Sequence, residues 1–171
     1  MPGAPHGGDV IDALVDCHLR MRQCTRRAAE LDSQPEPGPE TTREVAAKIH
    51  RYFTVALPLH EEDEEGSLFP RLLERMPQLR QRLAAFRRDH EALNDGVAGI
   101  VAASLEVKSG PGDAAAVGRL ASAARALEDV WQSHLSAEEG ELFPAARQAL
   151  SAEDRAAIRQ EMDARRARLP R

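Results

Sequence analysis

The chain contains few cysteines, few aromatic residues and no long apolar segment. Of its 171 residues, only two are cysteine and 4% are aromatic. Cys17 and Cys24 fall on one predicted helix, about 10 Å apart along its axis, which is too far for a disulfide, so free thiols in a reducing cytoplasm are expected. No stretch is apolar for long enough to cross a membrane, and the N-terminus lacks the basic start and apolar run of a signal peptide.

Positive charge is not in excess. The net charge is −5, which argues against a general nucleic-acid-binding protein. The C-terminal end is locally basic through Arg159, Arg165, Arg166, Arg168 and Arg171. We interpret these arginines as a solvated helix end that complements the helix dipole, with a binding patch for a partner or nucleic acid as the alternative.

The alternating polar and apolar pattern of strands is also missing. Ala, Leu, Glu and Arg dominate a composition that is 42% apolar and 30% charged, which favours a globular helical protein. The predicted helices cover residues 9–31, 41–65, 77–107, 113–139 and, shorter, 151–168. We predict one all-α domain over residues 9–171, an up-down-up-down antiparallel four-helix bundle with a short additional C-terminal helix, after a flexible tail at residues 1–8.

Prolines, glycines and capping residues set the predicted boundaries. Breaks are expected at residues 33–39, 66–70, 76–77, 109–112 and 140–144. The predicted helix starts are a capping box at Thr41 and Glu44, an N-cap at Asp113, and a second capping pattern at Ser151 and Asp154. Pro58 should kink the second helix two residues before His60, either as a tolerated kink or as a device that aims this histidine.

Two segments of the chain are nearly identical. Residues 60–70 read HEEDEEGSLFP and residues 134–144 read HLSAEEGELFP, a constant offset of 74 positions. Each copy carries a His and a Glu four residues apart, which are His60 with Glu64 and His134 with Glu138. On a helix this spacing places imidazole and carboxylate on one face, one turn apart, where they can share a metal ion. Two such motifs in one small domain indicate a binuclear metal site.

Two further histidines, His18 and His90, lie on the apolar stripes of the first and third predicted helices. Each long helix therefore directs one histidine into the interior. Burying Glu64 and Glu138 without a counter-charge would cost several kcal/mol each, and no cationic side chain shares their stripes. A bound metal ion would supply that charge, so we interpret the cluster as a metal site rather than a purely structural polar core.

The number of candidate ligands indicates two ions. Four imidazoles and two carboxylates exceed the roughly four ligands of a structural zinc, whereas two ions would leave open positions for a bridging group and an external ligand. Glu61, about 100° around the helix from His60, could add one more ligand. Mixed imidazole and carboxylate ligation suits iron, and also manganese or zinc. His50 lies about 80° away from His60 around the helix and His6 lies in the tail, so neither is assigned.

The order of one His, one His-x-x-x-Glu, one His and a second His-x-x-x-Glu over residues 18–138 resembles the hemerythrin-like family, the cation-binding HHE domain. The Leu-Phe-Pro after each motif is similar as well. The resemblance implies a four-helix bundle around two iron ions with an oxo or hydroxo bridge, and O₂, peroxide or nitric oxide as the small ligand. It assigns one iron to His18 and His60, the other to Glu61, His90 and His134, and the bridge to Glu64 and Glu138.

The sequence departs from oxygen-carrying hemerythrins at the third helix. Those proteins place two histidines four apart there, whereas the positions four residues either side of His90 hold Phe86 and Asn94. A Glu directly after the second-helix His, where Glu61 stands here, resembles the iron-sensing F-box hemerythrin-like domain and several bacterial relatives. The resemblance thus favours sensing or oxidative turnover over simple carriage of O₂.

We therefore expect a cytoplasmic di-iron protein that binds or reacts with O₂, peroxide or nitric oxide, with catalase-like turnover among the outcomes, and with no membrane or nucleic-acid partner. The alternatives are a di-iron oxygenase or oxidase acting on an organic substrate, an iron-sensing module acting through a partner, and a dizinc hydrolase. Glu65 and Glu139, which follow the motif carboxylates, are predicted to face solvent, with contact to the metal-binding side chains as the alternative. Trp131 and Tyr52 are predicted to be packing residues rather than redox relays.

Overall fold

The computed structural model describes residues 8–33 and 38–169, and every regular segment within these ranges is helical. The first rod is α1 (Val10–Ala29). The second runs without interruption through α2 (Pro39–Arg51), η1 (Tyr52–Ala56), α3 (Leu57–Asp63), η2 (Glu64–Leu68) and α4 (Phe69–Arg75). A 3₁₀ turn, η3 (Pro77–Leu79), leads into the third rod, α5 (Arg80–Ser109). The fourth rod joins α6 (Ala114–Ala137), η4 (Glu138–Leu142) and α7 (Phe143–Ala149), and α8 (Ala152–Ala167) follows.

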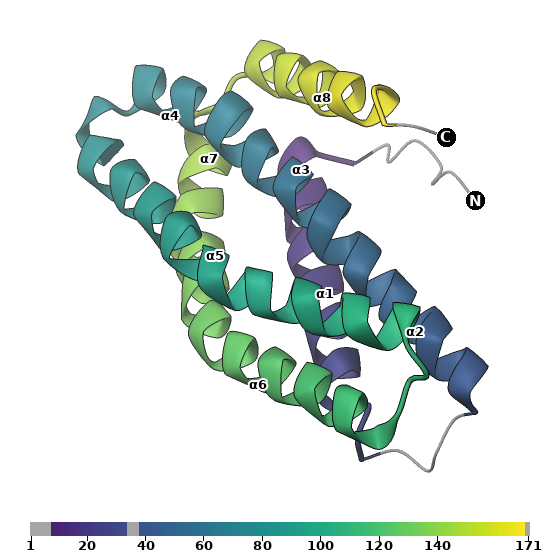
Figure 1. Cartoon of the computed structure of the whole chain (residues 1–171). Coiled ribbons are helices and arrows are strands. Elements are labelled where there is room, and N and C mark those ends of the chain that lie inside the picture. Colours follow the sequence, from purple (N-terminus) through teal and green to yellow (C-terminus); the bar gives the residue numbers. More distant parts are fainter. Residues whose placement is uncertain (1–7, 34–37, 170–171) are drawn as a thin grey trace.

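The four long rods lie side by side around a common interior (Figure 1). The third rod, α5, packs against both α2 and α6, and α1 packs against α6. Helix α8 lies on the outside, against α1, α3 and η2. The prediction of an all-helical protein is confirmed, whereas the predicted tail lies almost wholly outside the described residues. None of the described helices is long and apolar enough to traverse a bilayer.

Two of the predicted helix starts are confirmed. Asp113 caps α6 by accepting a hydrogen bond from a backbone N–H three residues on, at 2.8 Å. Ser151 and Asp154 form a reciprocal capping box at the start of α8. In both places a short polar side chain satisfies backbone donors that the first helical turn leaves without a partner.

The predicted capping box at Thr41 and Glu44 is wrong. The helix already begins at Pro39, with Gly38 before it as the N-cap residue. Proline at the first helical position has its φ preset for a helix and its missing N–H would have been unsatisfied there anyway. Thr41 and Glu44 therefore belong to the first turns of α2.

The predicted breaks at residues 66–70 and 140–144 are also wrong, because the helix continues through both. A π-helical segment overlaps each of them, and a third one precedes Pro58. In each segment the backbone N–H of the following residue bonds to a carbonyl five residues back. The bonded pairs are Phe69 with Glu64, Phe143 with Glu138, and Leu57 with Tyr52.

These π-helical segments explain how the rods accommodate prolines. Pro58, Pro70 and Pro144 each stand two positions after the last residue of such a segment. In a regular α-helix a proline ring clashes with the carbonyl four residues earlier and cannot donate to it. Here that carbonyl belongs to a wider turn, so the clash and the lost bond are absorbed without ending the helix. The extra residue also rotates the following chain by about one position relative to an ideal helix.

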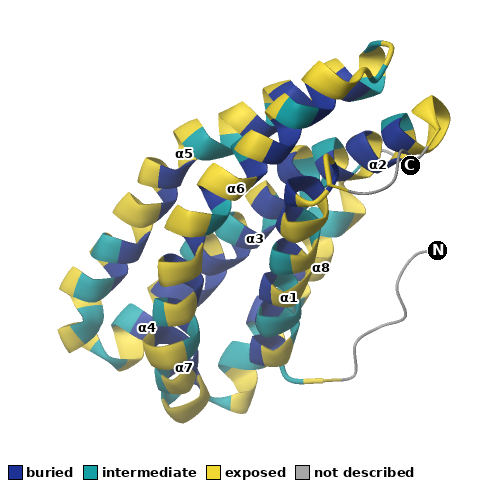
Figure 2. Ribbon diagram, turned by 90° about the horizontal axis from the view of Figure 1, so that it is seen from below, coloured by how far each residue is buried: buried dark blue, intermediate teal, exposed yellow. Residues whose placement is uncertain are grey.

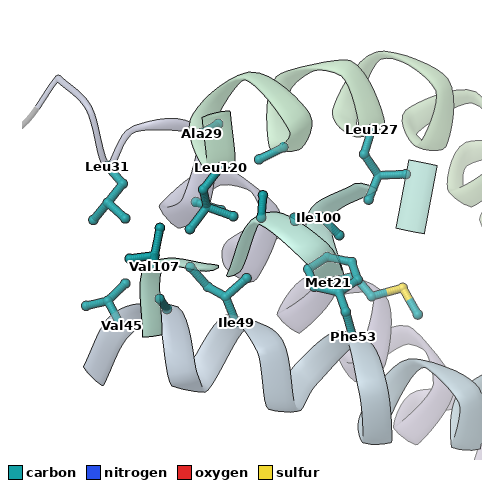
Figure 3. Packing of buried hydrophobic residues seen from close by; sticks show 14 of the residues in the cluster. Met21, Ala29, Leu31, Val45, Ile49, Phe53, Ile100, Val107, Leu120 and Leu127 are labelled. Carbon is teal, nitrogen blue, oxygen red and sulfur yellow. The ribbon is translucent and has the colours of Figure 1, made fainter. Parts of the chain in front are cut away.

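Two apolar clusters fill the interior on either side of a layer of buried polar side chains. The first includes Met21, Ile49, Phe53, Ile100 and Leu127 (Figure 3), and the second includes Ile11, Leu14, Phe69, Phe86 and Phe143. On α1, His18 lies between Leu14 of one cluster and Met21 of the other. Burial follows the inner faces of the rods, and the outer faces are exposed (Figure 2). The clusters thus hold the polar layer in place from both ends.

Helix α8 is fastened to the second rod by arginine–carboxylate pairs. Arg165 and Arg166 donate to the two oxygens of Asp63 at 2.9 and 2.7 Å, and Asp63 is fully buried. The interpretation of these two arginines as a solvated helix end is therefore wrong. A buried carboxylate is costly without a partner, and α8 supplies two. Arg159 donates to backbone carbonyls at the start of α1, and Arg171 lies outside the described residues.

Candidate metal centre

The polar layer contains four imidazoles and two carboxylates, contributed by all four long rods. They are His18 from α1, His60 from α3, Glu64 from η2, His90 from α5, His134 from α6 and Glu138 from η4. Each is at most 8% exposed. Apolar residues three or four positions away share their helical faces, so the burial of each stripe carries the polar side chain inward.

Glu64 directs its two oxygens to different sides of this layer. Its Oε1 lies 3.3 Å from His60 Nε2 and 3.9 Å from His18 Nε2. Its Oε2 lies 3.5 Å from His90 Nε2. One carboxylate therefore reaches both pairs of histidines.

Glu138 does the same from the opposite rod. Its Oε2 lies 3.2 Å from His18 Nε2. Its Oε1 lies 3.4 Å from His90 Nε2 and 3.2 Å from His134 Nε2. Two carboxylates that each span the same two clusters of nitrogens have the arrangement expected of groups that bridge two cations.

Two overlapping sets of donor atoms are close enough to hold ions. Within each set the donor atoms all lie within 4.8 Å of one another, and the sets are His18, His60, Glu64 and Glu138, and His90, His134 and Glu138. The carboxylate oxygens of Glu64 and Glu138 have no hydrogen-bond partner within residues 8–33 and 38–169. The same is true of His18 Nε2. Buried polar atoms are almost always satisfied, so these orphaned lone pairs fit a bound cation.

Burial and charge set the pKa values of the two carboxylates apart. Burial, followed by the negative charge of Glu138, raises the pKa of Glu64 well above its usual range. Burial also acts to raise the pKa of Glu138, but its histidine contacts, His134 first, hold that pKa well below the usual range. Burial, followed by the charge of His18, lowers the pKa of His60 to about 3. Without a cation, the pocket therefore favours one ionised carboxylate rather than two.

Two more glutamates hold the outer nitrogens of His18 and His90. Glu139 Oε1 accepts a hydrogen bond from His18 Nδ1 at 2.9 Å, and Glu65 Oε1 accepts one from His90 Nδ1 at 2.7 Å. The prediction that both glutamates face solvent is wrong, since they are only 32% and 34% exposed and bind histidines. A carboxylate on the outer nitrogen keeps the proton there, which leaves the inner Nε2 lone pair free for a metal.

An arginine lies against each of these two outer carboxylates. Arg22 donates to both oxygens of Glu139, at 2.6 and 3.1 Å, and Arg87 Nε lies 3.7 Å from Glu65 Oε2. Burial acts to raise the pKa of Glu139, but the hydrogen bonds from Arg22 and His18 lower it below its usual value. Burial alone would lower the pKa of His90, but its carboxylate contacts raise that pKa to about 9 as long as no cation binds Nε2. Each of these imidazoles thus lies between an inner and an outer carboxylate.

A phenylalanine one turn after each outer glutamate packs against the same imidazole. The ring centroids of Phe143 and His18 are 5.0 Å apart, and those of Phe69 and His90 are 6.4 Å apart with nearly parallel planes. The glutamate and the phenylalanine of one helical turn therefore contact the same imidazole, the glutamate at its outer nitrogen and the phenylalanine by ring packing. The second copy of the repeat holds His18 and the first copy holds His90, so the two halves of the chain position each other's histidines.

Glu61 belongs to neither set of donor atoms and instead lines a small cavity beside the centre. His60, His90 and His134 also line it, together with apolar side chains that include Trp131. Its volume, about 10 Å³ for the centre of a water molecule, is near the minimum that holds one water. Burial raises the pKa of Glu61. Ligation by this residue stays a prediction.

The remaining residues of interest lie outside the two sets. Tyr52 and Trp131 both pack on Phe53, with ring centroids 5.5 and 5.9 Å from it, as expected of packing residues. The Tyr52 hydroxyl donates to the Cys17 carbonyl at 3.4 Å. Both cysteines are free thiols, and His50 is partly exposed and off the centre.

Comparison with known proteins agrees with this geometry. The model of the hemerythrin HHE cation binding domain matches residues 9–146, which is most of the chain. The chain therefore belongs to the hemerythrin HHE cation-binding family. A protein of Haemophilus influenzae, described as an uncharacterized protein, is 30% identical over 87 residues, which cover 50% of this chain and 51% of that protein. The chain thus matches about half the length of that relative.

Proposed function

We propose that this chain is a di-iron protein that binds or reacts with O₂, peroxide or nitric oxide. The proposed metal ligands are His18, His60, Glu61, Glu64, His90, His134 and Glu138. The observation that carries the proposal is the pair of buried carboxylates. Their oxygens face two different groups of histidines and have no hydrogen-bond partner in the described part of the chain. We also propose that the four long rods form an up-down-up-down antiparallel bundle within one domain of residues 9–171.

The donor set supports iron. Nitrogen from imidazole and oxygen from carboxylate suit iron, manganese and zinc, and no sulfur donor is present in either set. Bound iron supplies reversible electron transfer to small oxygen and nitrogen species. The protein's own contribution is to keep Glu64 and Glu138 dry and close together, and to hold the protons of His18 and His90 on their outer nitrogens.

The size of the neighbouring cavity supports a small ligand. With room for about one water molecule, the cavity is closer in size to a diatomic gas or peroxide than to an organic substrate. Met21, Leu57 and Leu93 form part of its lining, beside Glu61 and the histidines. This observation ranks gas or peroxide chemistry ahead of an oxygenase acting on a larger molecule.

Anaerobic loading with ferrous iron tests the proposal. About two irons per chain are expected, with new near-ultraviolet absorption after O₂ is admitted and peroxide consumption without an organic co-substrate. One iron or none per chain, or spectra unchanged by O₂, peroxide and nitric oxide, would contradict it. Parallel loading with zinc and manganese shows which metal the chain prefers.

A matched pair of variants ties the result to the centre. Glu138→Gln should lower the iron content and the spectral change, because an amide offers one weaker oxygen donor instead of two anionic ones. Glu141, three residues further on, is exposed and pairs with Arg82, so Glu141→Gln should lose that surface pair and leave the iron content and the spectral change unaltered. A module that senses iron through folding would instead show a large loss of helical circular dichroism on chelation.

A further inference from the structure

A second hollow lies on the surface where α1, the second rod and the end of α8 meet. Its volume is about 550 Å³, within the range of small-molecule pockets. None of the residues that line it belongs to the proposed metal ligands. It is therefore a separate feature from the metal centre.

Three cations at this groove have no partner among the described residues. Arg20, Lys48 and Arg51 line it, are exposed, and form no ion pair or side-chain hydrogen bond with any residue in the described ranges. Asp16 and Glu44 stand one turn before Arg20 and Lys48 on the same helices, but neither lines the groove. In contrast to the arginines that fasten α8, these positive charges remain free to bind a ligand.

A fourth cation closes the same side of the groove. Arg166 lines it as well, and one of its amino groups binds Asp63 at 2.7 Å. This pairing holds the guanidinium in place beside the three free cations. On a protein with a net charge of −5, such a cluster is a local positive field that attracts an anion.

The rest of the lining is apolar. Val55, Leu59 and Leu169 contribute side chains that are only half-buried, and the Tyr52 hydroxyl is already used in its bond to Cys17. An apolar lining next to these cations suits a ligand that has both an anionic group and an apolar part. A simple inorganic anion would leave the apolar part of the lining unused.

We propose that this groove binds a small anionic amphiphile. Its carboxylate or phosphate head lies between Arg20, Lys48 and Arg51, and its short alkyl chain lies along Val55, Leu59 and Leu169. The groove's volume suits a chain of eight to ten carbons rather than a macromolecule. This binding needs no metal and does not depend on the proposed di-iron chemistry.

Calorimetric titration with octanoate, decanoate and decyl phosphate, below their micellar concentrations, tests the proposal on the full chain. Saturable one-to-one binding is expected, about fourfold tighter for each CH₂ group that enters the groove. Affinity should fall as salt rises, because the head group binds exposed cations. Decyltrimethylammonium, which has the same tail and the opposite charge, should not bind.

Charge-reversal variants locate the site. Lys48→Glu combined with Arg51→Glu should weaken decanoate binding at least tenfold, and it breaks no ion pair in the described structure. Arg80→Glu, an exposed residue at the start of α5 that does not line the groove, should leave affinity within twofold. Val55→Thr, which exchanges a methyl for a hydroxyl, should weaken decanoate more than octanoate if the tail lies there.

Vesicles distinguish a ligand that belongs to a lipid surface from one that is free in solution. Binding to phosphatidylglycerol vesicles with the same dependence on Lys48 and Arg51 assigns the head group to a lipid surface, whereas binding of free amphiphiles alone assigns it to a soluble acid or phosphate. No saturable binding of either form, equal binding of the cationic amphiphile, or affinity unchanged by the double reversal would overturn the proposal.

Discussion

Each histidine ring of the centre is held by residues that touch it from outside the two donor sets. Glu139 holds His18 and Glu65 holds His90 through the nitrogen that faces away from the inner carboxylates. Such outer carboxylates fix the proton and the ring orientation of a metal-binding imidazole. The strength of metal binding should therefore depend on residues that never touch the metal.

Replacing Glu139 with Gln tests this dependence. The amide still offers an oxygen but carries no charge, so we expect divalent-metal affinity to fall about tenfold to a hundredfold with the fold unchanged. Competition with a chromogenic chelator measures the affinity. Glu65→Gln should behave alike, and Glu141→Gln is the control. Unchanged affinity in both outer variants would show that these hydrogen bonds are structural only.

The repeat in the sequence contains a clue to the role of these two glutamates, which the helical spacing of single residues does not reveal. Glu65 and Glu139 occupy the same position in both copies of the repeat, and so do Phe69 and Phe143. The geometry of a regular α-helix predicts that both glutamates face solvent. The π-helical segments rotate the chain immediately after Glu64 and Glu138, and no local pattern of hydrophobicity reveals that rotation. The inner ligands come first in each motif and were easier to predict.

The two glycines of the repeat differ in what surrounds them. A Cβ at Gly66 would lie 3.0 Å from Arg165 Nη2, whereas a Cβ at Gly140 would meet nothing within 4 Å. Gly140→Ala should therefore stabilise the protein by about 0.5 to 1 kcal/mol, the usual gain of alanine in a helix. Gly66→Ala should gain less, because the Arg165 guanidinium would have to shift to make room for the new methyl group. Urea unfolding measures both, and equal effects would refute the close approach of α8.

At the scale of elements, the attachment of α8 depends on one buried charge. Asp63 receives Arg165 and Arg166, and Arg165 also donates to Ser67 of η2 at 2.8 Å. Asp63 lies three residues from His60 and one from Glu64 along the chain. Helix α8 thus covers the outer side of the rod that carries the first His-x-x-x-Glu motif.

Asp63→Asn should destabilise the protein by about 2 to 3 kcal/mol. The expected loss is below the 3–5 kcal/mol of a fully buried pair, because both guanidinium groups reach solvent. Urea unfolding gives the free energy, and limited proteolysis should show earlier cleavage within α8. Asp163→Asn, on the exposed side of α8, should change neither readout. Equal stability of the two variants would contradict this role of Asp63.

The long helices were predictable and their ends were less so. Apolar stripes predicted all four rods, and polar caps predicted the starts of α6 and α8. The rods that pass through Pro70 and Pro144 run much further than predicted, because a proline is a reliable stop only in a regular α-helix. The wider turn that accommodates the ring is a tertiary outcome, since burial of Phe69 and Phe143 favours continuing the helix.

For the whole molecule, the polar layer is a source of instability that a cation would remove. Four imidazoles and two carboxylates lie between two apolar clusters, and several of their atoms have no hydrogen bond to any described residue. Metal binding to the folded state alone should raise the free energy of unfolding by about 3 to 4 kcal/mol at 100 to 1,000 times the dissociation constant. Calorimetry with and without a chelator measures the shift. A melting temperature indifferent to metal would argue against a site within this layer.

Each copy of the repeat binds a histidine from the other half of the chain, so the two halves depend on each other to form the centre. Residues 1–76 carry His18 and the first His-x-x-x-Glu motif, and residues 77–171 carry His90 and the second motif. Each half positions a histidine of the other half through Glu65 or Glu139. Neither half contains a finished centre. Two polypeptides cut at this point should therefore act as complementing fragments that reunite when metal is added. A half-length ancestor working as a pair, later fused by duplication, would leave this pattern.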